Sequence, residues 1–247
     1  MIAHLPMYER AETKPAHDRY WSLIRAAFGT GPAVLTRNSD LWETWRHPDL
    51  LLSQTCGLPY RAHLHGEVTL IGTPDYGVPD CPPGHYRSVI IARPGARMTQ
   101  PSAAFNEPTS QSGWAALHGF LTDQQINPAH LVETGSHAAS AMAVLSGQAD
   151  IAAIDAVTWR ILTQWDMRLA DLNVIAQTPP VPGLPYIMAA GRDPDPIRQA
   201  IIHAIEKLSD GDRGHLHLTG LVMIPATDYL AIPVPPLPHE SRRNAVG

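Results

Sequence analysis

The chain has 247 residues, a hydrophobic fraction of 44% and a formal net charge of −5. This length can bury a substantial core, and the composition is typical of a folded protein rather than a disordered one. The acidic balance argues against nucleic acid as a main partner, and no apolar run approaches the roughly 20 residues that span a bilayer.

Predicted strands and helices alternate along the chain. In chain order we expect a strand over 1–7, helices over 20–28 and 39–46, strands over 49–55, 68–72 and 88–92, a helix over 114–121, a helix over 138–145, strands over 150–155, 172–176 and 186–190, and a helix over 196–208. Either Ser39 or Asp40 is expected as the N-cap of the second helix. Buried apolar strands that alternate with helices are typical of a parallel α/β sheet.

The segment Thr134–Trp159 contains the first two candidate binding residues. A helix begins near Gly135-Ser136-His137, and its apolar residues recur at i, i+3, i+4 and i+7, which places them on one face. The strand that follows ends on Asp155. Since ligands of open α/β sheets bind near helix N-termini and the carboxyl ends of strands, His137 and Asp155 are candidate ligand contacts.

The same order of helix, acidic residue, apolar strand and polar tip occurs about a hundred residues earlier, over 39–55. Two such units at distant points of the chain predict two similar lobes rather than one long sheet. We expect the first lobe to comprise 1–88 and 189–247 and the second to comprise 89–188.

A second helix start, after Phe105, carries several hydroxyl groups. Ser110, Gln111 and Ser112 precede the helix that begins near Trp114, and hydroxyls and unpaired N–H groups at a helix start are what an oxyanion needs. The alternative is that Ser110 or Ser112 is simply the N-cap. Capping and anion binding do not exclude each other.

Polar and aromatic residues also follow the predicted strands. Thr55 and Tyr60 follow the strand over 49–55, Tyr8 follows the first strand, and Tyr86 lies where the chain would cross between the lobes. A single tyrosine is more often half-buried packing than a ligand contact. Four such residues at strand ends indicate a cleft.

The remaining reactive side chains leave alternatives open or predict no site. Cys56 and Cys81 lie in Gly- and Pro-rich loops, and the sequence is compatible with a disulfide or with two thiols. The His-x-His pairs at 63–65 and 215–217 lack an HExxH, CxxC or acid-rich partner motif, so we expect no metal site. The chain also lacks GxGxxG, P-loop and GxSxG motifs, which favours binding over catalysis.

Several stretches together resemble the phosphate/phosphite/phosphonate family of periplasmic substrate-binding proteins, which serve ABC transporters. The matching stretches are DLLLSQTCGLPYR, YRSVIIAR, FNEPTSQSGWAA, GSHAASAMAVLSGQADIAAIDAVTW and LTGLVMIPATDYLAI. They occur in the family's order and cover most of the chain. The resemblance implies the two-lobed type II periplasmic-binding fold, an α/β fold in which each lobe is a mixed sheet flanked by helices and the lobes close around the ligand.

The resemblance also implies roles for particular residues. Ser110, Gln111 and Ser112 would hold a phosphonate group, with further contacts from His137, Asp155 and Tyr60. This chain reads SQSG where STSG is more usual in the family, so an amide replaces one hydroxyl donor.

We therefore expect a non-catalytic component of an ABC transporter that captures a small anion, phosphonate or phosphate-like, in a cleft between the lobes. The expected partners are this anion and an ABC permease, without a cofactor, and the protein is expected to be a periplasmic monomer. One alternative is an enzyme on the same fold, such as a chorismate-dehydratase-like protein, with Asp155 or His137 as the base. The start MIAHLPMYERAE, which turns polar almost at once, does not resemble a signal peptide and keeps a second alternative open, a cytosolic small-molecule sensor.

Overall fold

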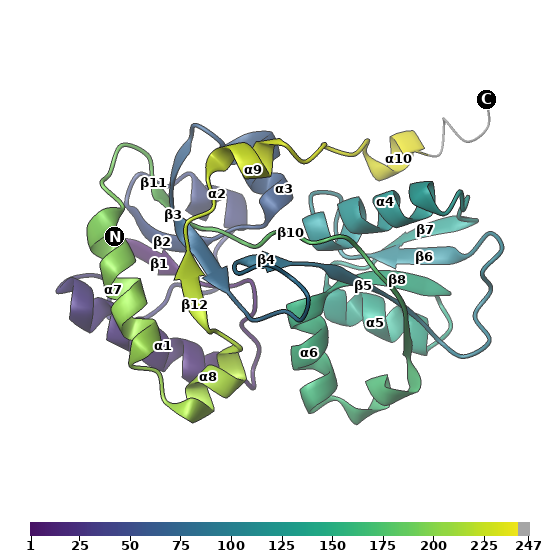
Figure 1. Ribbon diagram of the computed structural model, residues 1–247, viewed down its shortest axis with the longest axis horizontal. Coiled ribbons are helices and arrows are strands. Elements are labelled where there is room, and N and C mark those ends of the chain that lie inside the picture. Colours follow the sequence, from purple (N-terminus) through teal and green to yellow (C-terminus); the bar gives the residue numbers. More distant parts are fainter. Residues whose placement is uncertain (242–247) are drawn as a thin grey trace. The chain divides into compact units, whose positions relative to one another are not determined.

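The structure is a computed structural model that describes residues 1–241. By its internal contacts the chain forms two compact units (Figure 1). The first comprises Met1–His85 and Val181–Ile232, and the second comprises Tyr86–Pro180 and the segment that begins at Pro233. The expected boundaries after residues 88 and 188 lie three and eight residues later than those of this division. The expected lobes also differ at the end of the chain, since we expected the whole of 189–247 in the first lobe. The segment after Pro233 groups with the second unit, where the indole N–H of Trp114 donates to the Pro236 carbonyl at 2.8 Å.

The first unit is built on a five-stranded sheet. Its strand order is β1 (Ile2–His4), β2 (Leu50–Gln54), β11 (Tyr186–Ala189), β3 (Val68–Asp75) and β12 (Gly220–Val222). β1 and β2 are parallel, whereas β11 is antiparallel to both β2 and β3, and β12 is antiparallel to β3. The sheet is therefore mixed rather than parallel, and β1, β2 and β3 all point the same way.

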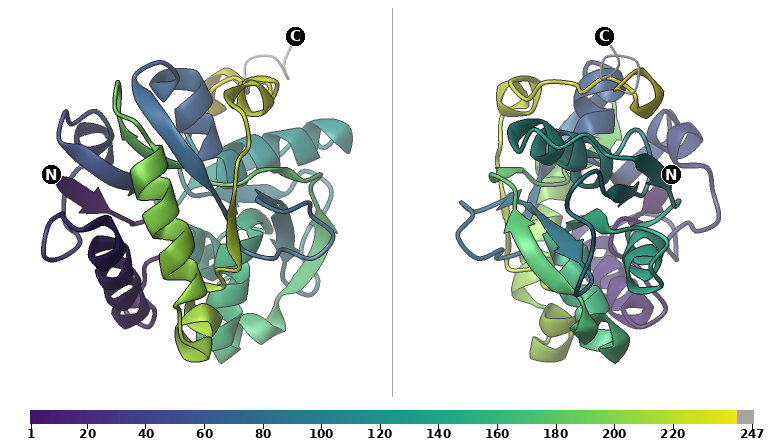
Figure 2. Two further views of the ribbon diagram at one scale, coloured as in Figure 1. Left: turned by 60° about the vertical axis from the view of Figure 1, so that its left-hand side comes forward. Right: turned by 90° about the vertical axis from the view of Figure 1, so that its right-hand side faces the viewer.

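Helices flank this sheet. They are α1 (Lys14–Phe28), α2 (Leu41–Trp45), α3 (Gly57–Pro59), the π-helix η1 (Tyr60–Leu64), α7 (Asp195–Glu206), α8 (Asp210–Leu216) and α9 (Ala226–Leu230). α1 packs along α7, and the two helices lie side by side in Figure 2. α1 begins earlier than the predicted 20–28, because Pro15 fits its first turn, and it ends at Gly29, which adopts the left-handed φ of 87°. Asp40 is the N-cap of α2 and accepts from the Glu43 N–H at 2.9 Å.

The second unit is built on a five-stranded sheet of its own. Its strand order is β7 (His130–Glu133), β6 (Ser102–Phe105), β8 (Ile151–Asp155), β5 (Ser88–Ala92) and β9 (Asn173–Gln177). β6 is parallel to β7 and β8, while β5 is antiparallel to β8 and β9. The carboxyl ends of β7, β6 and β8 therefore meet at one edge, where Ser88 of β5 lies opposite Asp155.

Helices follow the three parallel strands of this unit. They are the π-helix η2 (Gln111–Ala115), which continues into α4 (Ala116–Asp123), then α5 (His137–Leu145), α6 (Ala156–Trp165) and the 3-10 helix η3 (Met167–Asp171). A core of Ile90, Phe105, Trp114, Leu117 and Ile151 joins the sheet to η2 and α4. The short strands β4 (His85–Tyr86) and β10 (Val181–Pro182) pair separately, and α10 (Pro238–Ser241) ends the described chain. In residues 1–241, every helix is too short or too polar to cross a membrane.

Candidate anion-binding site

Three helices of the second unit begin at the edge where β6, β7 and β8 end. η2 follows β6 and is capped by Ser110, α5 follows β7 and is capped by Ser136, and α6 follows β8 and is capped by Asp155. A helix start presents N–H groups and a positive partial charge, which favours anions. Five of the predicted ligand residues, Ser110, Gln111, Ser112, His137 and Asp155, thus lie at one edge of one sheet.

The start of η2 is held in a tight local geometry. Ser110 accepts from the Gly113 N–H at 2.9 Å, so it is the N-cap that the sequence offered as one alternative. A Cβ placed on Gly113 would lie 1.8 Å from Oδ1 of Asn106 and 3.2 Å from its backbone nitrogen. The position therefore has no room for a side chain. Sequence reasoning did not single out Asn106, whose side chain fills the space beside Gly113.

One hydrogen bond joins the starts of η2 and α5. Ser112 Oγ and His137 Nε2 are 2.9 Å apart. Burial lowers the pKa of His137 to about 4, although its contact with the Ala153 backbone acts in the opposite direction. The ring is therefore neutral at pH 7 and bonds to the Ser112 hydroxyl in either tautomer. From the sequence, only the family resemblance predicted that Ser112 and His137 belong to the same site.

The lowered pKa of His137 makes stability depend on pH in a defined direction. In the unfolded chain the imidazole titrates near the ordinary value of 6.5, but in the folded chain it titrates at about 4. Between these values the unfolded state binds a proton that the folded state excludes. The free energy of unfolding should be fully retained above pH 6.5 and fall by up to about 3 kcal/mol as the pH is lowered toward 4.

Urea unfolding at pH 7.5, 5.5 and 4.5 measures this dependence. The His137→Gln variant should lose less stability than the unsubstituted protein over the same pH range. A residual slope should remain in the variant, because burial also lowers the pKa values of His4 and His17. Equal slopes for both proteins would contradict the assignment.

Asp155 lies at the end of β8 with a clear local role. It is buried, and its Oδ1 accepts from the N–H groups of Val157 at 2.7 Å and Thr158 at 3.0 Å. These bonds cap α6, as a carboxylate at a helix start does well. A contact with a ligand would come in addition to the cap.

Substitutions can separate the cap from a ligand contact. Asp155→Ala should lower the free energy of unfolding by about 1–2 kcal/mol, because the two N–H groups lose their acceptor. Asp155→Asn keeps an acceptor and should retain most of this stability. Thermal unfolding of both variants measures the difference, and an equal loss for Ala and Asn would show that the charge, rather than the cap, matters.

Carboxyl groups also lie close to this edge. Burial and the neighbouring Glu133 raise the pKa of Glu107, which follows β6. Tyr86, a further predicted contact, is buried in this unit, as is Gln111. In the hydrogen bonds described at the helix starts the donors are neutral N–H and O–H groups, and the only charged partner is the Asp155 carboxylate, which accepts. Binding of an anion at these helix starts would therefore depend on hydrogen bonds from neutral donors.

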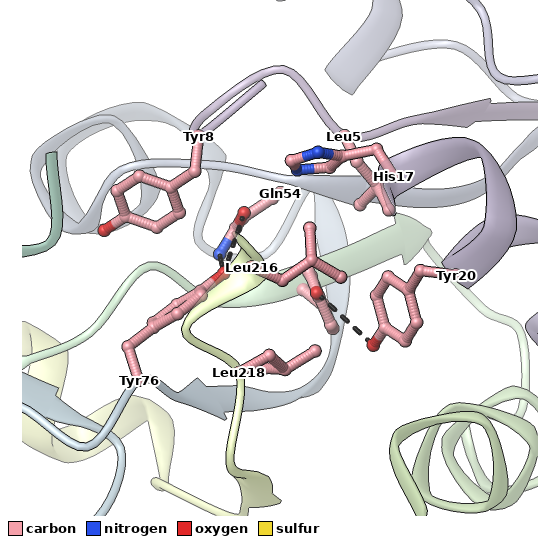
Figure 3. Close-up of a pocket in the computed structure, with 9 residues that line it drawn as sticks. Leu5, Tyr8, His17, Tyr20, Gln54, Tyr76, Leu216 and Leu218 are labelled. Carbon is pink, nitrogen blue, oxygen red and sulfur yellow. Dashed lines mark hydrogen bonds between the residues drawn. The ribbon is translucent and has the colours of Figure 1, made fainter. Parts of the chain in front are cut away.

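The first unit has a comparable polar cluster where β1, β2 and β3 end. The rings of Tyr8 and Tyr76 meet edge to face at 4.8 Å, and the Gln54 amide donates to the Tyr76 hydroxyl at 3.1 Å. Together with Tyr20 and His17 these residues line a cavity of about 10 Å³, room for about one water molecule (Figure 3). Of the predicted contacts, Tyr8 lines this cavity.

Sequence reasoning did not select Gln54 or Tyr76 as site residues. Gln54 is the last residue of β2, so its place at a strand end was a usable signal. Tyr76 follows β3, which runs to Asp75 rather than ending at the predicted Gly72. The longer strand therefore carries Tyr76 to the same sheet edge as Gln54.

Thr55 and Tyr60 are packed into the first unit. Thr55 is fully buried, and its N–H donates to the Pro185 carbonyl at 3.1 Å. Tyr60 packs edge to face against Tyr229 at 5.2 Å, and its burial raises the pKa of its hydroxyl. Neither residue lines the cavity in Figure 3.

The cysteines and histidines raise the questions of a disulfide and of a metal site. Cys56 and Cys81 are both thiols, so the structure adopts the second of the two alternatives that the sequence left open. Throughout the described part of the chain, no three His, Cys, Asp or Glu residues come together in a group that could hold a metal ion.

Several solved structures resemble this chain in their arrangement of elements. PhnD1 from Prochlorococcus marinus, solved with methylphosphonate, is 15% identical, with 100% of this chain and 98% of that chain covered and a TM-score of 0.72. A binding protein component of an ABC phosphonate transporter from Pseudomonas aeruginosa is 14% identical, with 93% and 82% covered and a TM-score of 0.70. The GluR0 ligand-binding core from Nostoc punctiforme, solved with L-glutamate, is 13% identical, with 87% and 96% covered and a TM-score of 0.55. These likenesses show the type II periplasmic-binding fold.

The sequence itself shows the family. No curated protein matches the chain. The model of the family described as "ABC transporter, phosphonate, periplasmic substrate-binding protein" matches residues 52–226, which is well over half of the chain and includes the starts of η2, α5 and α6. The chain therefore belongs to the phosphonate family of periplasmic substrate-binding proteins of ABC transporters.

Proposed function

We propose that the protein binds a small oxyanion of the phosphonate or phosphate class where η2 and α5 begin in the second unit. The observation that carries the proposal is the bond of 2.9 Å between Ser112 Oγ and His137 Nε2, which fixes polar groups from two helix starts together. In this role the protein passes its ligand to an ABC permease in the periplasm and acts as a monomer. The family match supports the permease and the periplasm.

The hydrogen-bond pattern suggests a role for each group at this edge. Ser110 uses its oxygen as an acceptor for the Gly113 N–H, which leaves its hydroxyl hydrogen to donate to an anion. Ser112 and His137 act as a coupled pair, and Gln111 supplies an amide where relatives more often have a hydroxyl. Asp155 keeps α6 in place and accepts a hydrogen bond from a protonated ligand oxygen or from a substituent.

The tyrosines complete the proposed set of contacts. Tyr8 has the strongest support, because it lines the polar cavity of the first unit with Gln54 and Tyr76 (Figure 3). Tyr60, Tyr86 and Thr55 are buried, so they would contact a ligand through one atom or position the residues that do.

Binding without catalysis suits the electrostatics of His137. A general base is most effective when its pKa is near the working pH. Burial holds the pKa of His137 at about 4, which makes it a weak base but a good neutral hydrogen-bond partner. This argues against the form of the enzyme alternative in which His137 is the base; the form with Asp155 as the base is tested by whether the ligand is converted.

Calorimetry against methylphosphonate, phosphate, methanesulfonate and acetate tests the proposal. We expect tight binding of a phosphonate or phosphate and much weaker binding of the sulfonate and carboxylate. ³¹P NMR of the same mixture over a day should recover the ligand unaltered. No binding by any phosphorus oxyanion would refute the ligand class, and conversion of the ligand would refute the non-catalytic role.

A further inference from the structure

None of the predicted ligand residues lines a second cavity in the first unit, although Tyr8 belongs to the stretch of chain beside it. Its volume is about 290 Å³, and it is formed by the stretch from His4 to Lys14 together with Arg37 and Asn38. A volume of this size is at the lower end of what small-molecule sites usually offer. The charge and polarity of the residues that line it indicate which ligands it could bind.

The lining is basic in a protein that is acidic as a whole. Arg10, Lys14 and Arg37 line the cavity, against one carboxylate, Glu9. The protein carries a formal net charge of −5 and has only two lysines, Lys14 and Lys207. Glu12 and Asp18, which pair with Arg10 and Arg37, lie next to this lining, so the charge that can attract an anion depends on how these cations are paired.

Carboxylates hold two of the three cations in place. Arg37 donates to both carboxylate oxygens of Glu9, at 2.6 and 3.0 Å, and to Asp18 at 2.7 Å. Arg10 lies 3.5 Å from Glu12. Lys14 is exposed and forms no ion pair within the described residues, so its ammonium group is available to an incoming anion.

His4 adds a buried polar atom whose hydrogen-bonding capacity is not used. It lines the cavity, is only 4% exposed, and its Nδ1 has no hydrogen-bond partner within the described residues. A buried polar atom without a partner is unfavourable, and a hydrogen bond to a bound ligand or water would offset this cost. Burial also lowers the pKa of His4, so the ring is neutral and does not add to the positive charge.

We propose that this cavity binds the phosphoryl group of a small soluble molecule, with Lys14 and Arg10 pairing with its oxygens and His4 as a neutral partner. A phosphoryl group suits this cavity, because Lys14 and Arg10 present charged donors and His4 a polar nitrogen to the same volume. Arg37 keeps its carboxylate partners and positions Glu9 at the cavity wall. This site is separate from the one at the starts of η2 and α5 and does not depend on it.

Titration of the full chain with inorganic pyrophosphate tests the proposal. Because pyrophosphate could also enter the site near Ser112, every protein in the series carries Ser112→Ala. In that background, Lys14→Ala should lower the affinity about tenfold, the effect of losing one charged hydrogen bond. The matched control is Lys207→Ala, which removes the other lysine and should change the affinity less than about twofold.

Arg10→Ala provides a second test within the cavity and should also weaken binding about tenfold. Circular dichroism of each variant checks that it is folded. Absence of pyrophosphate binding in the Ser112→Ala background would overturn the proposal. Equal effects of Lys14→Ala and Lys207→Ala would also overturn it, because they would indicate a general effect of charge.

Discussion

Replacing Gly113 by alanine should weaken the binding of methylphosphonate by about 5- to 150-fold. The new Cβ would lie 1.8 Å from Asn106 Oδ1, far inside normal contact, and 3.2 Å from the Asn106 backbone nitrogen. Either the Asn106 side chain or the start of η2 must move, and such overpacking costs about 1–3 kcal/mol. Movement of η2 would displace Ser112 from His137, and the proposed binding requires that these two side chains stay together. Calorimetry measures the affinity, and urea unfolding measures the accompanying loss of stability.

Gly119→Ala is the matched control. Gly119 lies within α4, and a Cβ there meets no atom within 4 Å. This substitution should leave the affinity unchanged and raise the free energy of unfolding by about 0.5–1 kcal/mol, because glycine is unfavourable within a helix. Asn106→Ala combined with Gly113→Ala removes the overlapping oxygen and should recover part of the lost affinity. Wild-type affinity in Gly113→Ala alone would show that η2 does not take part in binding.

Replacing Ser112 by alanine should weaken the binding of methylphosphonate by about 1–3 kcal/mol, or about 5- to 150-fold. The hydroxyl is one half of the pair with His137 Nε2, at 2.9 Å. Its removal takes a donor from the proposed anion site and leaves His137 without its partner in η2. The expected loss is large because Ser112 is only 4% exposed, which limits replacement of its hydroxyl by water.

Ser146→Ala is the matched control for this substitution. Ser146 lies at the other end of α5, where its hydroxyl donates to the Ala143 carbonyl at 3.3 Å. Calorimetry should find its affinity for methylphosphonate within about twofold of the unsubstituted protein. If Ser112→Ala and Ser146→Ala bind equally well, the proposed site is misplaced.

The sequence predicted most of the elements that position the site. The strand over 88–92 has the bounds of β5, and the helix and strand after Gly135 correspond to α5 and β8. These elements have strong local signals, because apolar residues recur with a clear period and glycine or a capping residue marks each end. The family and the type II fold, expected from the resemblance, are confirmed by the family match and the solved structures.

The sequence was less informative about direction and about contacts between distant residues. The alternation of strands and helices predicted a parallel sheet, whereas the resemblance implied a mixed sheet in each lobe. Both sheets are mixed, since β11 and β5 are antiparallel to their neighbours. Pairing direction depends on partners far apart in the chain, which a local pattern does not contain. The contacts of Asn106 with Gly113 and of Gln54 with Tyr76 likewise depend on how the chain folds, and the local sequence pattern does not contain them.

The π-helical start of η2 shows a further limit of local patterns. The predicted helix began at Trp114, whereas η2 begins at Gln111, so Gln111 and Ser112 lie inside the first turn. Serine and glutamine have no strong preference for such a turn, so their residue types did not indicate where the helix begins.

A crystal structure of the full chain with methylphosphonate tests the central claim most directly. The account predicts phosphonate oxygens within hydrogen-bond distance of Ser112 and of at least one further group at the starts of η2 and α5, with the Ser112–His137 bond retained. A phosphonate bound elsewhere, without contact to Ser110, Ser112 or His137, would contradict it.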